Sequence, residues 1–150
     1  MRDSIGIVQA MLETGAIGVL DIQTISFYSF EEWKNKIFTP IFNPCSHVSI
    51  LYTDTDKENV WLHTRGLRKF GRPDVSIENV KKSNIDDAMD IINQIIIYSS
   101  KGSFFKNSSK LHTSNGKSFI INFTFADDYE NIDFNNAYYK IVWKDCELVE

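Results

Sequence analysis

Residues 85–99 carry the feature that most restricts how this 150-residue chain can fold. Apolar residues recur there at the three- and four-residue spacing of an α-helix, and further apolar positions widen the stripe. The stripe consists of Ile85, Ala88, Met89, Ile91, Ile92, Ile95, Ile96 and Tyr98. Such a wide apolar face indicates a helix that packs across a β-sheet. The polar run 83–86 is expected to cap the N-terminus of this helix.

The sheet is predicted by runs of β-branched and aromatic residues on both sides of this helix. Five runs are expected to form strands: 47–53, 60–65, 74–80, 117–125 and 137–149. The first two runs are joined by the polar segment 54–59, which predicts an antiparallel hairpin. A shorter β-prone run lies at 17–22.

Two more helices are expected in the first part of the chain, over 4–14 and 30–38, and Ser29 opens the second with a capping box. The segment 100–116 is rich in Ser, Lys, Asn and Gly, and we expect it to be a mobile loop. Together these elements predict one α+β domain over 1–150. Its sheet is expected to be mainly antiparallel, with five or six strands and with two or three helices packed on one face.

Charge and cysteine content argue against several classes of protein. The formal net charge is −4, whereas a dedicated nucleic-acid-binding domain is expected to be basic. The longest apolar run, 95–98, is far too short to span a membrane, and the first residues show no secretory signal. Without export, Cys45 and Cys146 are expected to be free thiols. We therefore expect a cytoplasmic protein that binds neither nucleic acid nor a membrane.

The most distinctive segment, 61–74, combines a tryptophan, a histidine, four cations, two glycines and a proline. On a strand, His63 and Arg65 share one face. Gly66 and Gly71 are placed to bracket a tight turn or bulge, where a residue without Cβ is needed. The favoured interpretation is a structural turn between two strands, with a solvated basic edge.

Two functional interpretations of the same segment stay open. In the first, the cations bind an anion or an acidic protein, since guanidinium groups bind carboxylates and phosphates well. These cations are Arg65, Arg68, Lys69 and Arg72. In the second, His63 acts as an acid or base, because histidine titrates near neutral pH.

The segment also resembles a known signature. The pattern His-Thr-x-Gly-Leu, followed three residues later by Gly-x-Pro-Asp, is similar to that of uncharacterised bacterial domain families of unknown function. The matching residues are His63, Thr64, Gly66, Leu67, Gly71, Pro73 and Asp74. Some such domains are encoded beside toxin genes and are regarded as immunity or interaction proteins, like the suppressor-of-fused group. The specific part of the resemblance is confined to this segment, while the stretch from Val8 to Phe38 fits the families only loosely, as a helix followed by a strand. The resemblance implies no active site.

No metal, cofactor or nucleophile motif accompanies this segment. Cys45 and His47 do not have the spacing of a zinc site. The alternating carboxylates of 54–59 invite a calcium interpretation, but the loop lacks the required glycine and the closing glutamate. A solvated hairpin tip is the expected structure there. We expect no metal and no cofactor.

A second candidate surface is the acidic segment 127–134, in which carboxylates alternate with aromatic and aliphatic residues. The residues expected to make contact are Asp127, Asp128, Tyr129 and Glu130. Apolar anchors with an acidic rim suit a basic partner such as a nuclease toxin. An ordinary solvated loop with its aromatic side chains turned inward is the favoured alternative.

The sequence therefore predicts a non-enzymatic cytoplasmic domain that binds another protein, of an immunity or toxin-associated type, through the basic segment or the acidic loop. The alternative is a small hydrolase or transferase that uses His63 as base. In that case Asp74 or Glu78 lies within hydrogen-bonding distance of His63, and Arg65 or Arg68 holds an anionic substrate. Neither prediction implies an oligomeric state.

Overall fold

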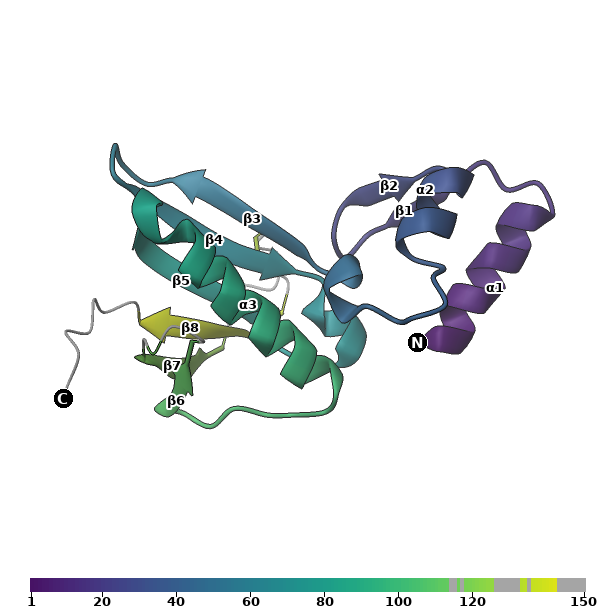
Figure 1. The fold of residues 1–150 in the computed structure, drawn as a ribbon. Coiled ribbons are helices and arrows are strands. Elements are labelled where there is room, and N and C mark those ends of the chain that lie inside the picture. Colours follow the sequence, from purple (N-terminus) through teal and green to yellow (C-terminus); the bar gives the residue numbers. More distant parts are fainter. Residues whose placement is uncertain (114–115, 117, 126–132, 135, 143–150) are drawn as a thin grey trace.

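A six-stranded sheet crossed on one face by a long helix forms the larger part of the computed structural model (Figure 1). The structure describes residues 1–113, 116, 118–125, 133–134 and 136–142. A smaller lobe, built from the first part of the chain, lies beside one end of the sheet (Figure 1). The predicted α+β class and the mainly antiparallel sheet are confirmed.

The sheet has the strand order β3-β4-β5-β8-β7-β6. Its strands are β3 (Ser49–Asp54), β4 (Asn59–Arg65), β5 (Asp74–Lys81), β6 (Ser109–His112), β7 (Ser118–Thr124) and β8 (Tyr138–Val142). All neighbouring strands are antiparallel except β5 and β8, which pair in parallel at the centre of the sheet. The sequence predicted both strands but not their parallel pairing.

Strand β6 lies inside the segment 100–116, which the sequence predicts to be a loop. The strand is an edge strand held by its pairing with β7, with Leu111 opposite Phe119. The start of the segment is also tied to the sheet, because the Phe105 N–H donates to the Tyr139 hydroxyl at 3.2 Å. The polar composition of this segment does not predict a strand. The strand forms because β7 provides hydrogen-bond partners for its backbone.

The helix α3 (Ile85–Ser100) packs most of its apolar stripe against the sheet, as predicted (Figure 1). Tyr98, which was also predicted to belong to the stripe, is 49% exposed. The buried core between the helix and the sheet includes Ala88, Ile91, Ile92, Ile95, Ile96, Val60, Leu62, Val75, Ile77, Val80, Phe119, Ile121, Tyr139 and Ile141. The cap expected at 83–86 is not formed by a side chain. Asn84 makes no side-chain cap hydrogen bond, and a short 3₁₀ helix, Lys82–Asn84, leads into α3 instead.

The smaller lobe contains α1 (Arg2–Glu13), the hairpin β1 (Val19–Asp21) and β2 (Ser26–Tyr28), and α2 (Phe30–Lys36). It has its own apolar cluster, formed by Ile5, Leu12, Trp33 and Ile37. The predicted capping box of α2 is confirmed, because the Ser29 hydroxyl accepts from the Glu32 N–H and the Glu32 carboxylate accepts from the Ser29 N–H. Within the described residues, no helix is long and apolar enough to cross a membrane.

Candidate functional site

The turn between β4 and β5 is closed by the buried carboxylate of Asp74. Its Oδ1 accepts from the Thr64 hydroxyl at 3.0 Å and from the Leu67 N–H at 3.1 Å, and its Oδ2 accepts from the Asn136 amide at 3.1 Å. The Thr64 hydroxyl in turn accepts from the Val75 N–H at 2.9 Å. Burial raises the pKa of Asp74, and the hydrogen bonds from Asn136, Leu67 and Thr64 offset part of that rise. Thr64 and Asp74 of the signature thus hold the turn together.

The same turn joins the sheet to the smaller lobe. Gly66 has a φ of +116°, and a Cβ at this position would lie 2.8 Å from the His47 carbonyl oxygen and from Thr24 of the lobe. The Arg65 Nε–H donates to the Gln23 carbonyl at 3.3 Å, and Lys69 forms an ion pair with Asp21 of β1. The segment 61–74 therefore serves as the contact between the two parts of the fold.

The four cations of this segment do not form one exposed basic patch. Arg65 is buried, and Lys69 is engaged by Asp21 in a half-buried ion pair. The Arg72 guanidinium lies 3.9 Å from the centroid of the Phe104 ring, a cation–π contact. Arg68 is exposed. Arg65, Lys69 and Arg72 thus make contacts within the chain, as a structural turn requires.

His63 lies on the face of the sheet opposite α3, within an aromatic cluster. Its ring stacks on Trp61 with the centroids 4.2 Å apart and lies 5.4 Å from the ring of Phe134. The side chain is 3% exposed, and among the described residues neither ring nitrogen has a hydrogen-bond partner. Burial lowers the pKa of His63, the Asp133 carboxylate at 3.9 Å opposes the shift, and Arg65 adds to it.

The carboxylates expected beside His63 are occupied elsewhere. Asp74 accepts from the groups of the turn, and in the part of the chain that is described no hydrogen bond joins it to His63. Glu78 is exposed and pairs with Lys140 at 2.9 Å. The structure therefore joins neither Asp74 nor Glu78 to His63 by a hydrogen bond, although the Asp133 carboxylate lies 3.9 Å from the His63 Nε2.

His47 is a buried histidine of the lobe contact. It ends a short 3₁₀ helix, Pro44–His47, and stacks on Phe42 with ring centroids 5.0 Å apart. Burial and the charge of Lys69 lower its pKa to about 4, while Asp21 opposes the shift. His47 is therefore neutral at pH 7.

The neutral state of His47 predicts a pH dependence of stability. Between about pH 6.5 and 4 the unfolded chain binds a proton at His47 that the folded chain does not, so the fold loses stability as the pH falls. The variant His47→Phe preserves the ring stacking but cannot bind this proton. We expect its free energy of unfolding to fall by roughly 2–3 kcal/mol less than that of the wild type over this pH range. Urea unfolding of both proteins from pH 7.5 to 4 measures the effect. The prediction is contradicted if the difference in the free energy of unfolding between wild type and His47→Phe is the same at pH 7.5 and at pH 4.

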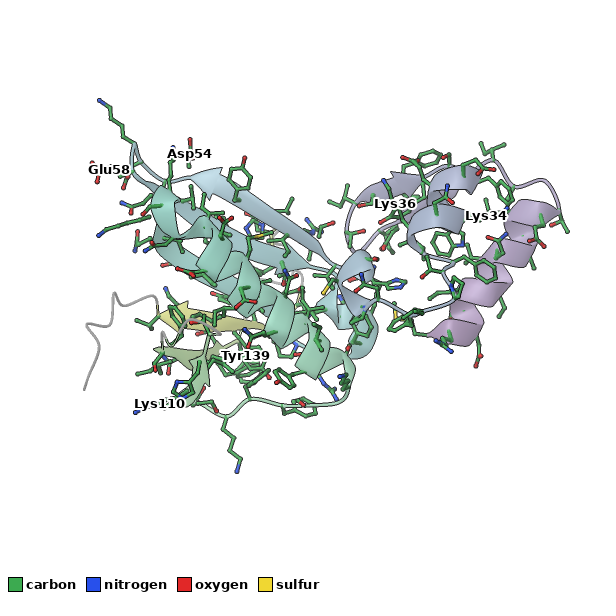
Figure 2. All side chains as sticks on the ribbon, viewed as in Figure 1. Lys34, Lys36, Asp54, Glu58, Lys110 and Tyr139 are labelled. Carbon is green, nitrogen blue, oxygen red and sulfur yellow. The ribbon has the colours of Figure 1, made fainter. Side chains whose placement is uncertain are left out.

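The carboxylates between β3 and β4 form an exposed hairpin tip, as predicted, and Figure 2 shows Asp54 and Glu58 there. Asp56 Oδ1 accepts from the Glu58 and Asn59 N–H groups, both at 2.8 Å, and Asp54 pairs with Lys82 at 3.1 Å. These contacts stabilise the turn itself. No group of three metal-binding side chains is found among the residues that the structure describes.

The acidic surface predicted for Asp127, Asp128, Tyr129 and Glu130 lies outside the described residues, as does Cys146. Within them, Cys45 is a free thiol, and burial raises its pKa.

An exposed apolar surface on the hairpin β1–β2 was missed by the sequence analysis. Side chains alternate along the strands, so Val19 and Asp21 point into the lobe while the intervening residues point outward. The outward surface consists of Leu20, Ile22, Ile25 and Phe27, each between 61% and 70% exposed, and we refer to it as the hairpin face. Leu20 and Phe27 lie directly opposite each other in the strand pairing. The sequence carries one signal of this surface, the apolar residues Leu20 and Ile22 at alternate positions of the β-prone run 17–22.

Comparison with known proteins places the larger part of the chain in one family. Residues 48–130, more than half of the chain, match the model described as "Protein of unknown function (DUF4026) C-terminal". The matched segment includes β3 to β7 and α3, and therefore the turn closed by Asp74. No curated protein matches the chain, and no solved structure does.

Proposed function

The chain belongs to the family of DUF4026 C-terminal domains, whose function is unknown, and we propose that it is a non-enzymatic domain that binds another protein. The hairpin face is the observation that carries this proposal. Four large apolar side chains are exposed on this hairpin, with Leu20 and Phe27 opposite each other in the strands and Ile22 and Ile25 in the turn that joins them. Monomeric soluble proteins seldom leave large apolar patches uncovered. Burying one such side chain in an interface contributes about 1.5–3 kcal/mol.

The geometry favours this surface over the basic segment. Arg65, Lys69 and Arg72 already make contacts within the chain, so releasing them for a partner would break the contact between lobe and sheet. The residues of the hairpin face are each more than 60% exposed and do not belong to the apolar cluster of the lobe. The partner we propose therefore offers an apolar surface of its own.

The class of partner follows from the resemblance of 61–74 to immunity-type domains. We propose that the partner is a toxin-like protein and that binding takes place in the bacterial cytoplasm. The burial of both His63 ring nitrogens beside aromatic rings and the engagement of Asp74 and Glu78 elsewhere weigh against the enzymatic alternative, although the Asp133 carboxylate lies 3.9 Å from Nε2.

The double variant Leu20→Lys/Phe27→Lys tests the hairpin face. Both side chains are exposed, so we expect the free energy of unfolding to change by less than about 1 kcal/mol. Capture of a partner from source-cell lysate on the immobilised chain is expected to fall at least about tenfold, since two central apolar contacts become desolvated charges. Quantitative mass spectrometry measures the captured protein.

The matched control is Ile7→Lys/Met11→Lys. These residues lie on α1 in the same lobe and are each 59% exposed, so the control adds the same charge to a similar surface. We expect it to retain the partner. Equal capture by both double variants, or equal loss in both, contradicts the proposal that the hairpin face is the binding surface.

A further inference from the structure

Strand β3 forms one edge of the six-stranded sheet, and within the described residues β4 is its one neighbour. The pairing of β3 with β4 keeps a regular register from Ser49 opposite Arg65 to Asp54 opposite Val60. The outer side of such an edge strand presents a row of N–H and C=O groups that another chain can pair with.

Hydrogen bonds on both sides of β4 show which residues of β3 face outward. The Thr55 N–H donates to the Asn59 carbonyl at 3.0 Å, and on the other side of β4 the Lys82 N–H donates to the Glu58 carbonyl at 2.8 Å. Backbone groups alternate in direction along an antiparallel pair, so the odd-numbered residues of β3 bond to β4. The three residues of β3 that turn their N–H and C=O groups away from the sheet are therefore Ile50, Tyr52 and Asp54.

The two edges of the sheet differ in how well they are protected. The other edge strand, β6, is four residues long and carries the exposed Lys110 (Figure 2), and short edges with a lysine discourage pairing with another chain. β3 is six residues long, contains no lysine or proline, and has no bulge in its pairing with β4. Its exposed residues include Tyr52 at 68% and Leu51 at 40%. β3 is therefore the edge to which a further strand can be added.

The outward row of β3 is complementary to a second copy of itself. In an antiparallel pair of β3 strands centred on Tyr52, Ile50 of each copy lies opposite Asp54 of the other, and the two Tyr52 residues lie opposite each other. Every outward N–H and C=O of both copies is then paired. The two-fold axis closes this interface on itself, so it gives a dimer and not an open chain of copies.

The same axis brings opposite charges together at the two ends of β3. The hairpin tip 54–59 has three carboxylates and one lysine. At the other end of β3, Lys36 lies on the smaller lobe (Figure 2) and lines a surface pocket of about 540 Å³ together with Ser46. In the register centred on Tyr52, Glu58 of one copy is level with Ser46 of the other. The acidic tip of each copy therefore faces the lobe that carries Lys36 in the other copy.

We propose that β3 is a dimer interface, at which a second copy of this chain adds its own β3 in antiparallel orientation and joins the two sheets into one. The interface lies on the edge of the six-stranded sheet, whereas the hairpin face lies on the smaller lobe. The proposal therefore does not depend on the protein-binding function.

Sedimentation velocity of the full chain between about 1 and 500 µM tests the proposal, and we expect a reversible equilibrium of monomer and dimer. Tyr52→Pro removes the outward N–H at the centre of the axis and leaves the bonds of β3 to β4 in place. We expect the dissociation constant of the dimer to rise at least about thirtyfold, because two carbonyl groups lose their donors. The matched control is Tyr52→Thr, which loses the same side chain but keeps the N–H. It is expected to change the constant less than about fivefold.

A charge exchange gives a second test that leaves β3 unchanged. Lys36 lies 3.8 Å from Glu32, but both side chains are exposed, so the ammonium group is accessible to a partner. Lys36→Glu is expected to weaken the dimer about three- to tenfold at low salt. Adding Glu58→Lys in the same chain is expected to restore most of the affinity, because both copies carry both changes. Lys110→Glu makes the same charge change at the other edge of the sheet and should leave the dimer unchanged.

The proposal is overturned if the wild-type chain stays monomeric at about 500 µM. A dimer that Tyr52→Pro does not weaken also overturns it, because that dimer uses another surface. Circular dichroism shows whether Tyr52→Pro is folded. If it is not, the charge exchange decides, and equal affinities of Lys36→Glu and Lys110→Glu overturn the proposal.

Discussion

Replacing Asp74 with alanine is expected to lower the free energy of unfolding by about 2–4 kcal/mol. The carboxylate accepts from the Thr64 hydroxyl, the Leu67 N–H and the Asn136 amide, so its loss leaves buried donors without an acceptor. The Leu67 N–H is the most costly of these, because it cannot rotate toward another partner. Urea unfolding at pH 7, followed by circular dichroism, measures the loss.

Asp54→Ala is the matched control. Asp54 is an exposed carboxylate that pairs with Lys82 at the hairpin tip, and an exposed ion pair contributes less than about 1 kcal/mol. Similar losses in Asp74→Ala and Asp54→Ala would contradict the structural role assigned to the buried carboxylate.

Asp74→Asn adds a test by pH. Because the folded pKa of Asp74 is raised, the folded chain holds the proton more tightly than the unfolded chain. The stabilisation by the protonated group is present below the unfolded value of 3.8 and is lost as the pH rises through the folded pKa. The asparagine variant cannot show this loss. We therefore expect wild type to lose stability relative to the variant as the pH rises above 3.8, and the opposite trend would contradict the raised pKa.

Replacing Gly66 with alanine is expected to cost about 2–6 kcal/mol. The φ of +116° is unfavourable for a residue with Cβ, which accounts for roughly 1–3 kcal/mol. The new Cβ would also meet the His47 carbonyl and Thr24 at 2.8 Å, and overpacking of this kind costs about 1–3 kcal/mol more. The carbonyl belongs to the backbone, so the clash is relieved only by moving the lobe away from the sheet.

Gly71→Ala separates the two causes. Gly71 ends the same turn with a φ of +66°, but a Cβ there meets no atom within 4 Å. We expect this control to cost about 1–2 kcal/mol, the conformational penalty alone. Thermal unfolding of both variants, with tryptophan fluorescence as readout, compares them. Equal losses would show that Gly66 does not limit the contact between lobe and sheet.

Much of the secondary structure could be predicted because its signals are local. The stripe of α3, the capping box at Ser29 and the hairpin of β3 and β4 each depend on residues only a few positions apart. Strand β6 could not be predicted, because Ser109–His112 has little β-propensity and is held by its neighbour β7. The outward direction of the hairpin face also required the structure, since either face of a two-stranded element can point inward.

The candidate sites were predicted less well than the fold. The sequence marked 61–74 as unusual and favoured a structural turn, and Thr64, Asp74 and Gly66 fit that interpretation. It could not show the internal contacts of Arg65, Lys69 and Arg72. Their partners Gln23, Asp21 and Phe104 are distant in sequence. The pocket beside Trp33 had no signal in the sequence, because its lining residues come from segments far apart in the chain, from Ile5 to Lys69.

The sequence by itself determined the α+β class, the long helix that crosses the sheet and the turn that ends at Asp74. Periodicity, capping and turn chemistry act over a few residues, so they can be read along the chain. The tertiary structure alone decided that β5 and β8 are parallel neighbours, that Lys69 meets Asp21, and that a pocket lies beside Trp33. These features depend on which apolar faces meet when distant segments pack, and the free energy of that packing is shared by the whole fold and not by any one segment.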